Sequence, residues 1–127
     1  MRRPLLVFLL AFAACATDTR AGVARQTGID GGWTSAKGGT HLDVTGDVAT
    51  LHFQGRRFIF KPVGRLNGYV GETDVGLRGG GIHIVLDLKA VSVQQRGHAP
   101  VEAPLAEIPV GATVQYARGR LRVLGRG

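Results

Sequence analysis

Residues 40–61, THLDVTGDVATLHFQGRRFIFK, carry the clearest secondary-structure pattern of this chain. Apolar and polar residues alternate around two glycines, and a period of two is the pattern of a β-strand with one buried face. Two-residue turns at Gly46 with Asp47 and at Gly55 with Arg56 place glycine first, as a type II′ turn prefers. The stretch therefore predicts three antiparallel strands joined by two hairpins.

These turns also predict which side chains face one another. The expected pairs are Val44 with Ala49, Leu42 with Leu51, Phe53 with Phe58, and Leu51 with Phe60. All of these side chains fall on one face of the sheet, and a one-residue slip would move them all to the other face. Turn chemistry and hydrophobic pattern thus predict a common buried face.

The middle of the chain continues in short strands. Asn67 and Gly68 predict a further hairpin turn. Residues 79–81, three glycines, predict a flexible hairpin connection, because a phosphate-binding loop would continue with Lys and Ser or Thr and open a helix. Residues 82–96 predict one long buried strand or two strands with a bulge, and a helix over residues 86–95 is the minority alternative.

The C-terminal part predicts one connection and one more hairpin. Residues 97–111 contain three prolines and predict a surface connection. A turn at Arg118 and Gly119 would pair Val114 with Val123 and Tyr116 with Leu121. About eight short strands are expected in all, so the predicted fold class is all-β, a small antiparallel β-sandwich or barrel.

The N-terminus has the pattern of an export signal. Arg2 and Arg3 precede an apolar run over residues 5–16, and residues 17–20 are polar. The run would extend about 18 Å as a helix, well short of the roughly 30 Å of a bilayer core. This segment therefore predicts a removable signal peptide.

The end of the run, Phe12-Ala13-Ala14-Cys15, resembles the lipobox of bacterial lipoproteins, although that family usually has an aliphatic residue in the place of Phe12. The resemblance implies cleavage before Cys15 and a diacylglycerol on its sulfur, and two or three acyl chains anchor a protein stably in a membrane. It also implies an outer-membrane lipoprotein facing the periplasm, since Ala16 follows the cysteine. Cleavage by an ordinary signal peptidase after Ala13, giving a soluble periplasmic or secreted protein, is the alternative.

The predicted organisation is a signal peptide at residues 1–14, a lipidated N-terminus and tether at 15–28, and a single β domain at 29–127. The whole chain holds 16 Lys and Arg against 9 Asp and Glu, and only Arg2 and Arg3 lie in the signal segment, so the remainder keeps a net charge of +5. This excess favours anionic surfaces as partners. Nucleic acid is not expected, because of the export signal and because aromatic residues do not alternate with the basic ones.

Two histidines form a candidate metal site. The predicted register puts His41 directly opposite His52 on the outer face, with Asp43 two residues along the strand. Opposed residues have Cβ atoms about 5 Å apart, so two imidazoles and a carboxylate could hold zinc or copper weakly. The alternative is a solvated polar pair, since a closed structural site has four ligands.

The densest basic spot in the chain lies in the last hairpin. Arg118 sits in the turn, and Arg120 and Arg122 share the face opposite Tyr116 and Leu121. These three arginines are the candidate site for binding an anionic surface. Protection of a sheet edge against aggregation is the alternative reading of the same residues.

The function expected from these features is a non-catalytic, lipid-anchored module that binds an anionic envelope component or an envelope protein. Ser35 and Ser92 have no His and acid at a recognisable spacing, so no enzyme is predicted, and no cofactor beyond the covalent lipid on Cys15. Gly31-Gly32-Trp33 resembles the Gly-x-Trp that opens lipocalins. That resemblance implies the alternative function, a carrier of a small apolar ligand.

Overall fold

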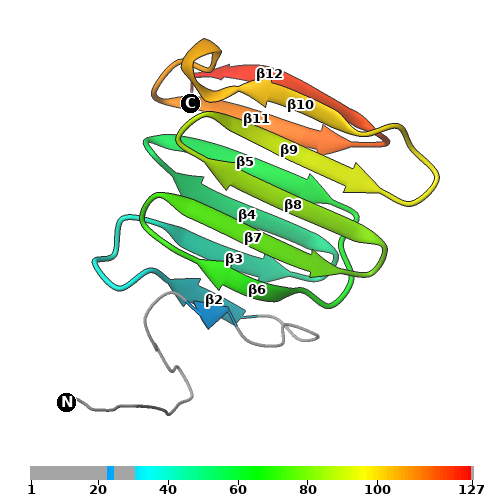
Figure 1. The fold of residues 1–127 in the computed structure, drawn as a ribbon, viewed down its shortest axis with the longest axis horizontal. Coiled ribbons are helices and arrows are strands. Elements are labelled where there is room, and N and C mark those ends of the chain that lie inside the picture. The colour runs from blue at the N-terminus through cyan, green and yellow to red at the C-terminus, as the bar shows by residue number, and fades with distance from the viewer. Residues whose placement is uncertain (1–22, 25–30, 127) are drawn as a thin grey trace.

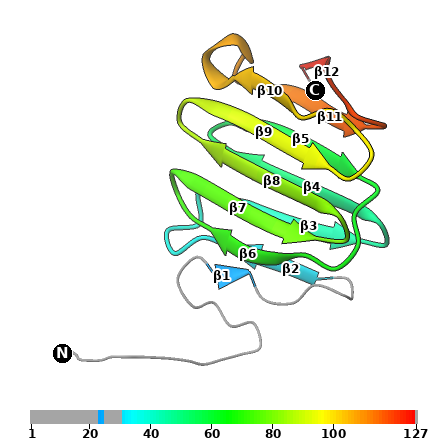
Figure 2. The ribbon, with the colours of Figure 1, turned by 45° about the vertical axis from the view of Figure 1, so that its right-hand side comes forward.

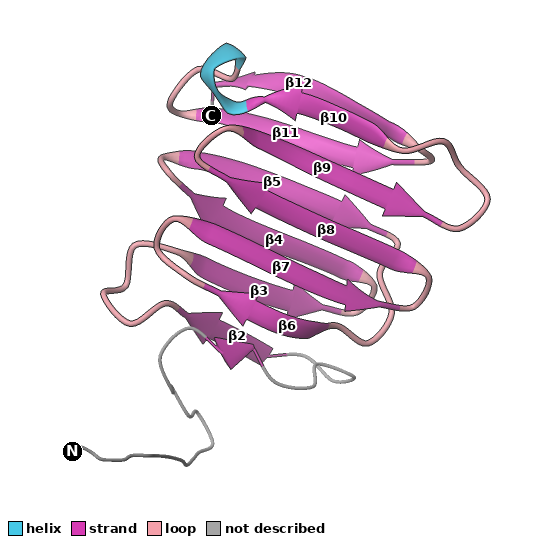
Figure 3. Ribbon diagram, in the orientation of Figure 1, coloured by secondary structure: helices cyan, strands magenta, loops and turns pink. Residues whose placement is uncertain are grey.

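The computed structural model describes residues 23–24 and 31–126, and strands dominate this part of the chain (Figure 3). It contains twelve strands and one short 3-10 helix within these residues. In chain order they are β1 (Val23–Ala24), β2 (Gly31–Thr34), β3 (His41–Thr45), β4 (Val48–Phe53), β5 (Arg56–Lys61), β6 (Asn67–Val70), β7 (Asp74–Gly79), β8 (Ile82–Asp87), β9 (Ala90–Gln95), β10 (Val101–Pro104), η1 (Leu105–Glu107), β11 (Ala112–Ala117) and β12 (Arg120–Arg126).

The strands form two six-stranded sheets that lie face to face (Figure 1). Sheet A has the order β1-β6-β7-β8-β9-β10, and sheet B has the order β12-β11-β5-β4-β3-β2. All pairs are antiparallel except β11 with β5, which is parallel. The edges of the sheets also approach each other, β1 toward β2 and β10 toward β12 (Figure 2). The predicted all-β class is confirmed, whereas the expected number of about eight strands was too low.

One hydrophobic core fills the space between the sheets. Successive side chains of a strand point to opposite faces, so each strand contributes every second residue to the core. Phe53, Phe58, Phe60 and Tyr116 are completely buried there, and sheet A covers them with aliphatic side chains such as Ile84. The Tyr116 hydroxyl also donates a hydrogen bond of 2.8 Å to Gln95 Oε1, which joins β11 to β9 across the core.

The first predicted hairpin is confirmed, whereas the predicted register of the second hairpin is wrong by two residues. Gly46 and Asp47 form the first turn, with Leu42 opposite Leu51. The second turn is Gln54 with Gly55, at φ 50° and 77°. Both central residues of a type I′ turn have positive φ, so glycine takes the second place here instead of the first.

The corrected register pairs Leu51 with Phe58 and Ala49 with Phe60. A shift of two residues keeps every side chain on its face, because faces alternate with a period of two. The predicted buried face of β3, β4 and β5 is therefore confirmed, although the predicted partners of Phe58 and Phe60 were wrong.

Asn67 and Gly68 do not form a turn, contrary to the prediction, but begin β6. Gly68 has φ 149°, and a Cβ there would lie 1.9 Å from the Gly76 carbonyl oxygen. The glycine thus permits a close approach of β6 to β7. The three glycines at 79–81 do connect two strands, as predicted, with Gly79 opposite Ile82.

The stretch at residues 82–96 forms two strands, so the minority expectation of a helix over 86–95 is wrong. A tight turn, and not a bulge, separates β8 from β9. Asp87 Oδ1 stabilises that turn by accepting hydrogen bonds from the backbone N–H groups of Lys89 and Ala90, at 2.7 and 2.9 Å.

Strands also form in two segments that were predicted as a connection and a tether, and at the start of the predicted β domain. Residues 97–111 include β10 and η1, since β10 pairs with β9 as an edge strand, where proline is tolerated. Val23 and Ala24 of the predicted tether pair with β6. Gly31–Thr34 forms β2, in which Trp33 packs partly buried against the core.

The turns gather at two opposite ends of the strands. One end, on the right in Figure 1, holds the turns β3–β4, β5–β6, β7–β8, β9–β10 and β11–β12. Neighbouring turns contact one another at this end. Two backbone hydrogen bonds join them, from Val63 N–H to Asp47 O and from Arg96 N–H to Gly81 O, each at 2.8 Å. Gly64 also lies against Gly80, and the His98 ring lies against Gly119. The remaining turns of residues 31–126 lie at the other end.

Candidate anion-binding surface

The three arginines predicted to bind anions surround one depression on the outer face of sheet B. Its volume is about 560 Å³, and its lining consists of Lys61, Gln115, Ala117, Arg118, Arg120 and Arg122. Four of these six side chains are cations, and no carboxylate of the described residues is among them. The predicted grouping of Arg118, Arg120 and Arg122 is thus present in the structure, with Lys61 added to it.

Strand register explains how the depression forms. Ala117 of β11 lies between Lys61 of β5 and Arg120 of β12, and Gln115 lies beside Arg122. Neighbouring strands are about 4.8 Å apart, so the Cα atoms of Lys61 and Arg120 are roughly 10 Å apart. The Ala117 methyl group between them is too short to fill the gap, and the longer cationic side chains rise on either side.

The turn residues place the third arginine as predicted. Arg118 and Gly119 have φ 55° and 80°, as in a type I′ turn, and the C-terminal hairpin pairs Val114 with Val123 and Tyr116 with Leu121. Because Tyr116 points into the core, Ala117 and Arg120 point outward. The hairpin register therefore directs the basic side chains to solvent.

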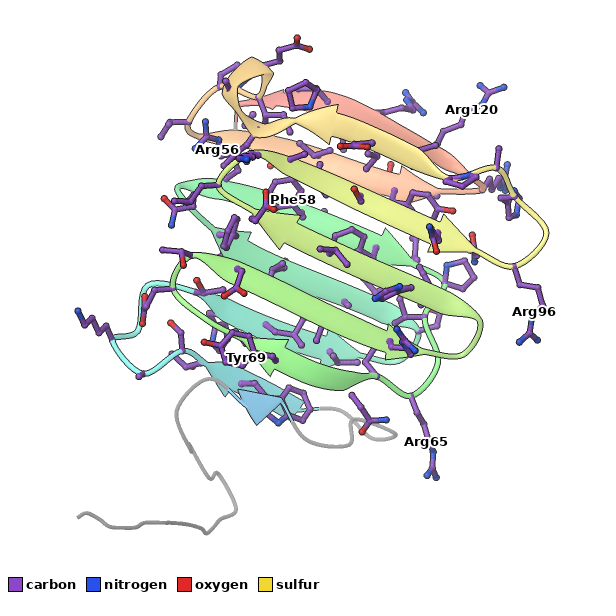
Figure 4. All side chains as sticks on the ribbon, in the orientation of Figure 1. Arg56, Phe58, Arg65, Tyr69, Arg96 and Arg120 are labelled. Atoms are coloured by element: carbon purple, nitrogen blue, oxygen red, sulfur yellow. The ribbon has the colours of Figure 1, made fainter. Side chains whose placement is uncertain are left out.

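Further cations lie at the same end, and sequence reasoning missed them. We call this the basic end and define it by the exposed cations Lys61, Arg65, Arg78, Arg96, Arg118 and Arg120. Figure 4 shows Arg65, Arg96 and Arg120 extending from this end, and Arg56 on the opposite side. Among the described residues of the five turns, Asp47 is the single carboxylate, and no ion pair involves the six cations.

A second depression lies on the outer face of sheet A at the same end. Its volume is about 760 Å³, and its polar lining includes Arg78, His83, Gln94, Arg96 and His98. The register places Arg78 opposite His83, and His83 opposite Gln94. Residues from three strands and one loop therefore meet in this depression.

The predicted pairing of His41 with His52 is confirmed, and the metal site expected on this pair stays a prediction. The rings of His41 and His52 lie 6.3 Å apart with planes tilted by 35°, and His41 Nδ1 is 2.9 Å from Thr34 Oγ1. Within the described residues, no three His, Cys, Asp or Glu side chains, Asp43 included, form a group that could hold a metal ion. Burial, followed by repulsion from His41 and Arg57, lowers the pKa of His52 below its ordinary 6.5.

The opposite end also carries charges, but two of them serve the fold. Arg56 donates from Nε to Ile108 O at 2.9 Å, from Nη1 to Gln54 O at 2.6 Å and from Nη2 to Leu105 O at 3.3 Å. It thereby fastens the segment around η1 to the β4–β5 turn.

Glu72 has a similar role between the sheets. Its carboxylate accepts hydrogen bonds from the backbone N–H groups of Lys37 and Gly39 and from the Ser35 side chain, so the β6–β7 turn of sheet A holds the β2–β3 loop of sheet B. These hydrogen bonds, that of Ser35 foremost, lower the pKa of Glu72 below its ordinary 4.5. We call this the clamp end, defined by Arg56 and Glu72.

Cys15, the signal peptide and most of the predicted tether lie outside the described residues. The described part of the chain contains no helix with the length and apolar character needed to cross a membrane. No protein-family model matches the chain, and neither the curated proteins nor the solved structures searched contain a significant match. The molecule is therefore classed by its own geometry, as a two-sheet β protein with a basic end.

Proposed function

We propose that this protein is an exported, lipid-anchored, non-catalytic module of the bacterial envelope that binds anionic groups of another envelope component at its basic end. The observation that carries the proposal is the depression on sheet B, which is lined by Lys61, Arg118, Arg120 and Arg122 without a carboxylate. The location we propose is the outer membrane, facing the periplasm.

The chemistry of the lining favours carboxylate, sulfate or phosphate groups as ligands. A guanidinium group presents a planar set of donors that fits two oxygens at once, so Arg is suited to such groups. Several like charges around one depression also raise the local concentration of anions. The lining contains no Ser, Cys, His, Asp or Glu side chain, the usual sources of a nucleophile or a general base together with Lys, which supports binding without catalysis.

The proposed anchor rests on the sequence of residues 1–15. A thioether-linked diacylglycerol on Cys15, with a further acyl chain on its amine, would hold the protein at the membrane. The intact mass of the protein purified from membranes tests this part. A mass that starts at Cys15 with added lipid is expected, whereas a chain that starts at Met1 would contradict the anchor.

The interior of the molecule favours a binding surface over the lipocalin-like carrier. A carrier needs an internal cavity beside Trp33. Phe53, Phe58 and Phe60 are completely buried between the sheets, and Trp33 packs against the same core. These aromatic side chains occupy the space that a ligand would require.

Retention on immobilised heparin, used as a model polyanion, tests the binding proposal. The protein should bind at about 0.05 M salt and elute before about 0.5 M, because added salt shortens the distance over which charges act. Changing Lys61 to Gln, Arg118 to Asn and both Arg120 and Arg122 to Ala should shift elution to a much lower salt concentration. Asn is chosen at residue 118 because it tolerates positive φ.

A control variant removes two positive charges from the other end. Lys37→Ala together with Lys89→Ala changes two exposed cations outside the basic end and should leave the elution position almost unchanged. Equal retention of the wild type and of the variant with four changes in the depression would refute the proposed function. Circular dichroism of each variant shows whether the fold is kept.

A further inference from the structure

We infer that the ligand of the basic end is a flexible anionic polysaccharide that passes around this end from sheet B to sheet A. The inference rests on the proposed function and adds the class of ligand to it. Its starting point is the second basic depression, of about 760 Å³, on the outer face of sheet A. A ligand with a single anionic group would occupy one depression, so two basic depressions on two sheets favour a ligand with several anionic groups.

The second depression has the composition of a sugar-binding surface. Arg78 and Arg96 supply two exposed cations for acidic groups. His83, Gln94 and His98 supply ring nitrogens and an amide, which donate and accept hydrogen bonds as sugar hydroxyls require. A ligand with both acidic groups and hydroxyls would match this lining better than a simple anion.

The two depressions are joined by neighbouring turns. The His98 ring lies against Gly119, since a Cβ at Gly119 would be 2.6 Å from His98 Nδ1. His98 lines the depression on sheet A, and Arg118, beside Gly119, lines the depression on sheet B. The cationic side chains from Arg96 to Arg118 therefore form a path around the end of the two sheets. Asp47 lies off this path, in a turn separated from β11 by β5, whereas the carboxylate of Glu102 on β10 lines a separate depression with Arg120 and Arg122.

The placement of the depressions argues against a membrane surface as the ligand. They lie on the outer faces of two different sheets, whose planes are about 10 Å apart, and a flat bilayer cannot cover two faces that point away from each other. Membrane surface binding also uses apolar side chains that insert between lipids. None of the exposed large apolar side chains of the described residues lies in the turns of the basic end; they are Tyr69, Val85, Leu88, Val110, Val123 and Leu124.

The same end lacks the features that favour single-stranded nucleic acid. Proteins of that class stack bases on exposed aromatic side chains beside their cations. The described turns of the basic end contain no Phe, Tyr or Trp, and His98 carries their one aromatic ring. Tyr69, the exposed aromatic residue of sheet A, leans instead over Gly71 next to Glu72, at the clamp end. A charged, hydroxyl-rich and flexible polymer fits the two depressions better than a bilayer or a nucleic acid strand.

Heparin-derived oligosaccharides of two lengths test the inference, with affinities measured by calorimetry on the full protein. A disaccharide reaches one depression, whereas a dodecasaccharide reaches both, so the longer probe should bind at least about 10-fold more tightly. Arg78→Ala with Arg96→Ala should remove most of this gain, because the depression on sheet A then loses its two cations. Lys37→Ala with Lys89→Ala removes the same charge from elsewhere and should keep the gain.

The outcomes separate this inference from the proposed function. If Arg78→Ala with Arg96→Ala leaves the length dependence intact, the second depression is not part of the site, and the inference fails while the depression on sheet B stands. If Arg120→Ala with Arg122→Ala changes binding of neither probe, the proposed function fails as well. Binding to phosphatidylglycerol vesicles or to oligothymidylate that is tighter than binding to the dodecasaccharide would overturn the polysaccharide assignment.

Discussion

Both ends of the molecule carry arginine side chains and use them differently. At the clamp end, Arg56 and Glu72 form hydrogen bonds to the backbone of distant segments. At the basic end, Arg96 and Arg120 are exposed, and within the described residues no ion pair occupies them. A charge that satisfies the backbone is part of the fold, whereas a charge without an internal partner is free to bind a ligand.

Loop geometry explains the difference between the ends. The loops at the clamp end, such as residues 35–40 and 105–111, leave backbone groups outside the strand ladders, and buried groups of this kind need partners. Arg56 and Glu72 supply those partners. At the basic end the turns satisfy one another through their own backbones, for example Arg96 N–H with Gly81 O.

The largest effect on stability is expected at Gly79 of the basic end, where two backbone segments are in direct contact. Gly79 has φ 158°, and a Cβ would lie 1.5 Å from the Arg65 carbonyl oxygen. Gly79→Ala should therefore lower the free energy of unfolding by about 3 kcal/mol or more, measured by urea denaturation. Gly76→Ala in the same strand is the control, because a Cβ there meets nothing within 4 Å. Equal stability of the two variants would show that this end does not rely on close backbone packing.

A smaller effect should distinguish two arginines. Arg56→Ala removes three hydrogen bonds to carbonyl oxygens and should lower the free energy of unfolding by about 2 to 3 kcal/mol. Arg96→Ala removes an exposed side chain of the basic end and should change stability by less than about 0.5 kcal/mol. Thermal denaturation of both variants checks the contrast between the ends. A similar loss of stability in both variants would contradict the proposed contrast between the ends.

The smallest effect concerns pH at the clamp end. Because the pKa of Glu72 is lowered in the folded protein, its ionised form adds stability above about pH 4.5, and this contribution is lost as the pH falls through the lower folded-state pKa. The melting temperature of the wild type should exceed that of Glu72→Gln at pH 7, and the gap should narrow toward about pH 3. A gap independent of pH would mean that the Glu72 charge does not hold the β2–β3 loop.

Local chemistry allowed part of the architecture to be predicted. The first and last hairpins were predicted in register, because a two-residue turn and an alternating pattern both lie within a dozen residues. The turn at Gln54 was missed because a glycine can take either place of a tight turn, depending on its type. β10 was missed because its short, proline-containing stretch becomes a strand only through pairing with β9.

The candidate site also has one part that could be predicted from the sequence and one part that could not. Arg118, Arg120 and Arg122 belong to one hairpin, so their common location could be predicted from the sequence. Lys61 joins them only because β5 pairs in parallel with β11, a contact between segments more than fifty residues apart. Asp43 does not join His41 and His52 in a metal-binding group, because neighbouring positions on a strand do not ensure that side chains converge.

The period of two, the inward face of β3, β4 and β5 and the basic character of the last hairpin could be predicted from the amino-acid sequence, since all three depend on residues close together along the chain. Which strands became neighbours, and therefore which cations share a depression, followed from the folding of the whole domain. Pairing between distant strands depends on burying the whole apolar face of both sheets at once, and no single segment encodes that choice.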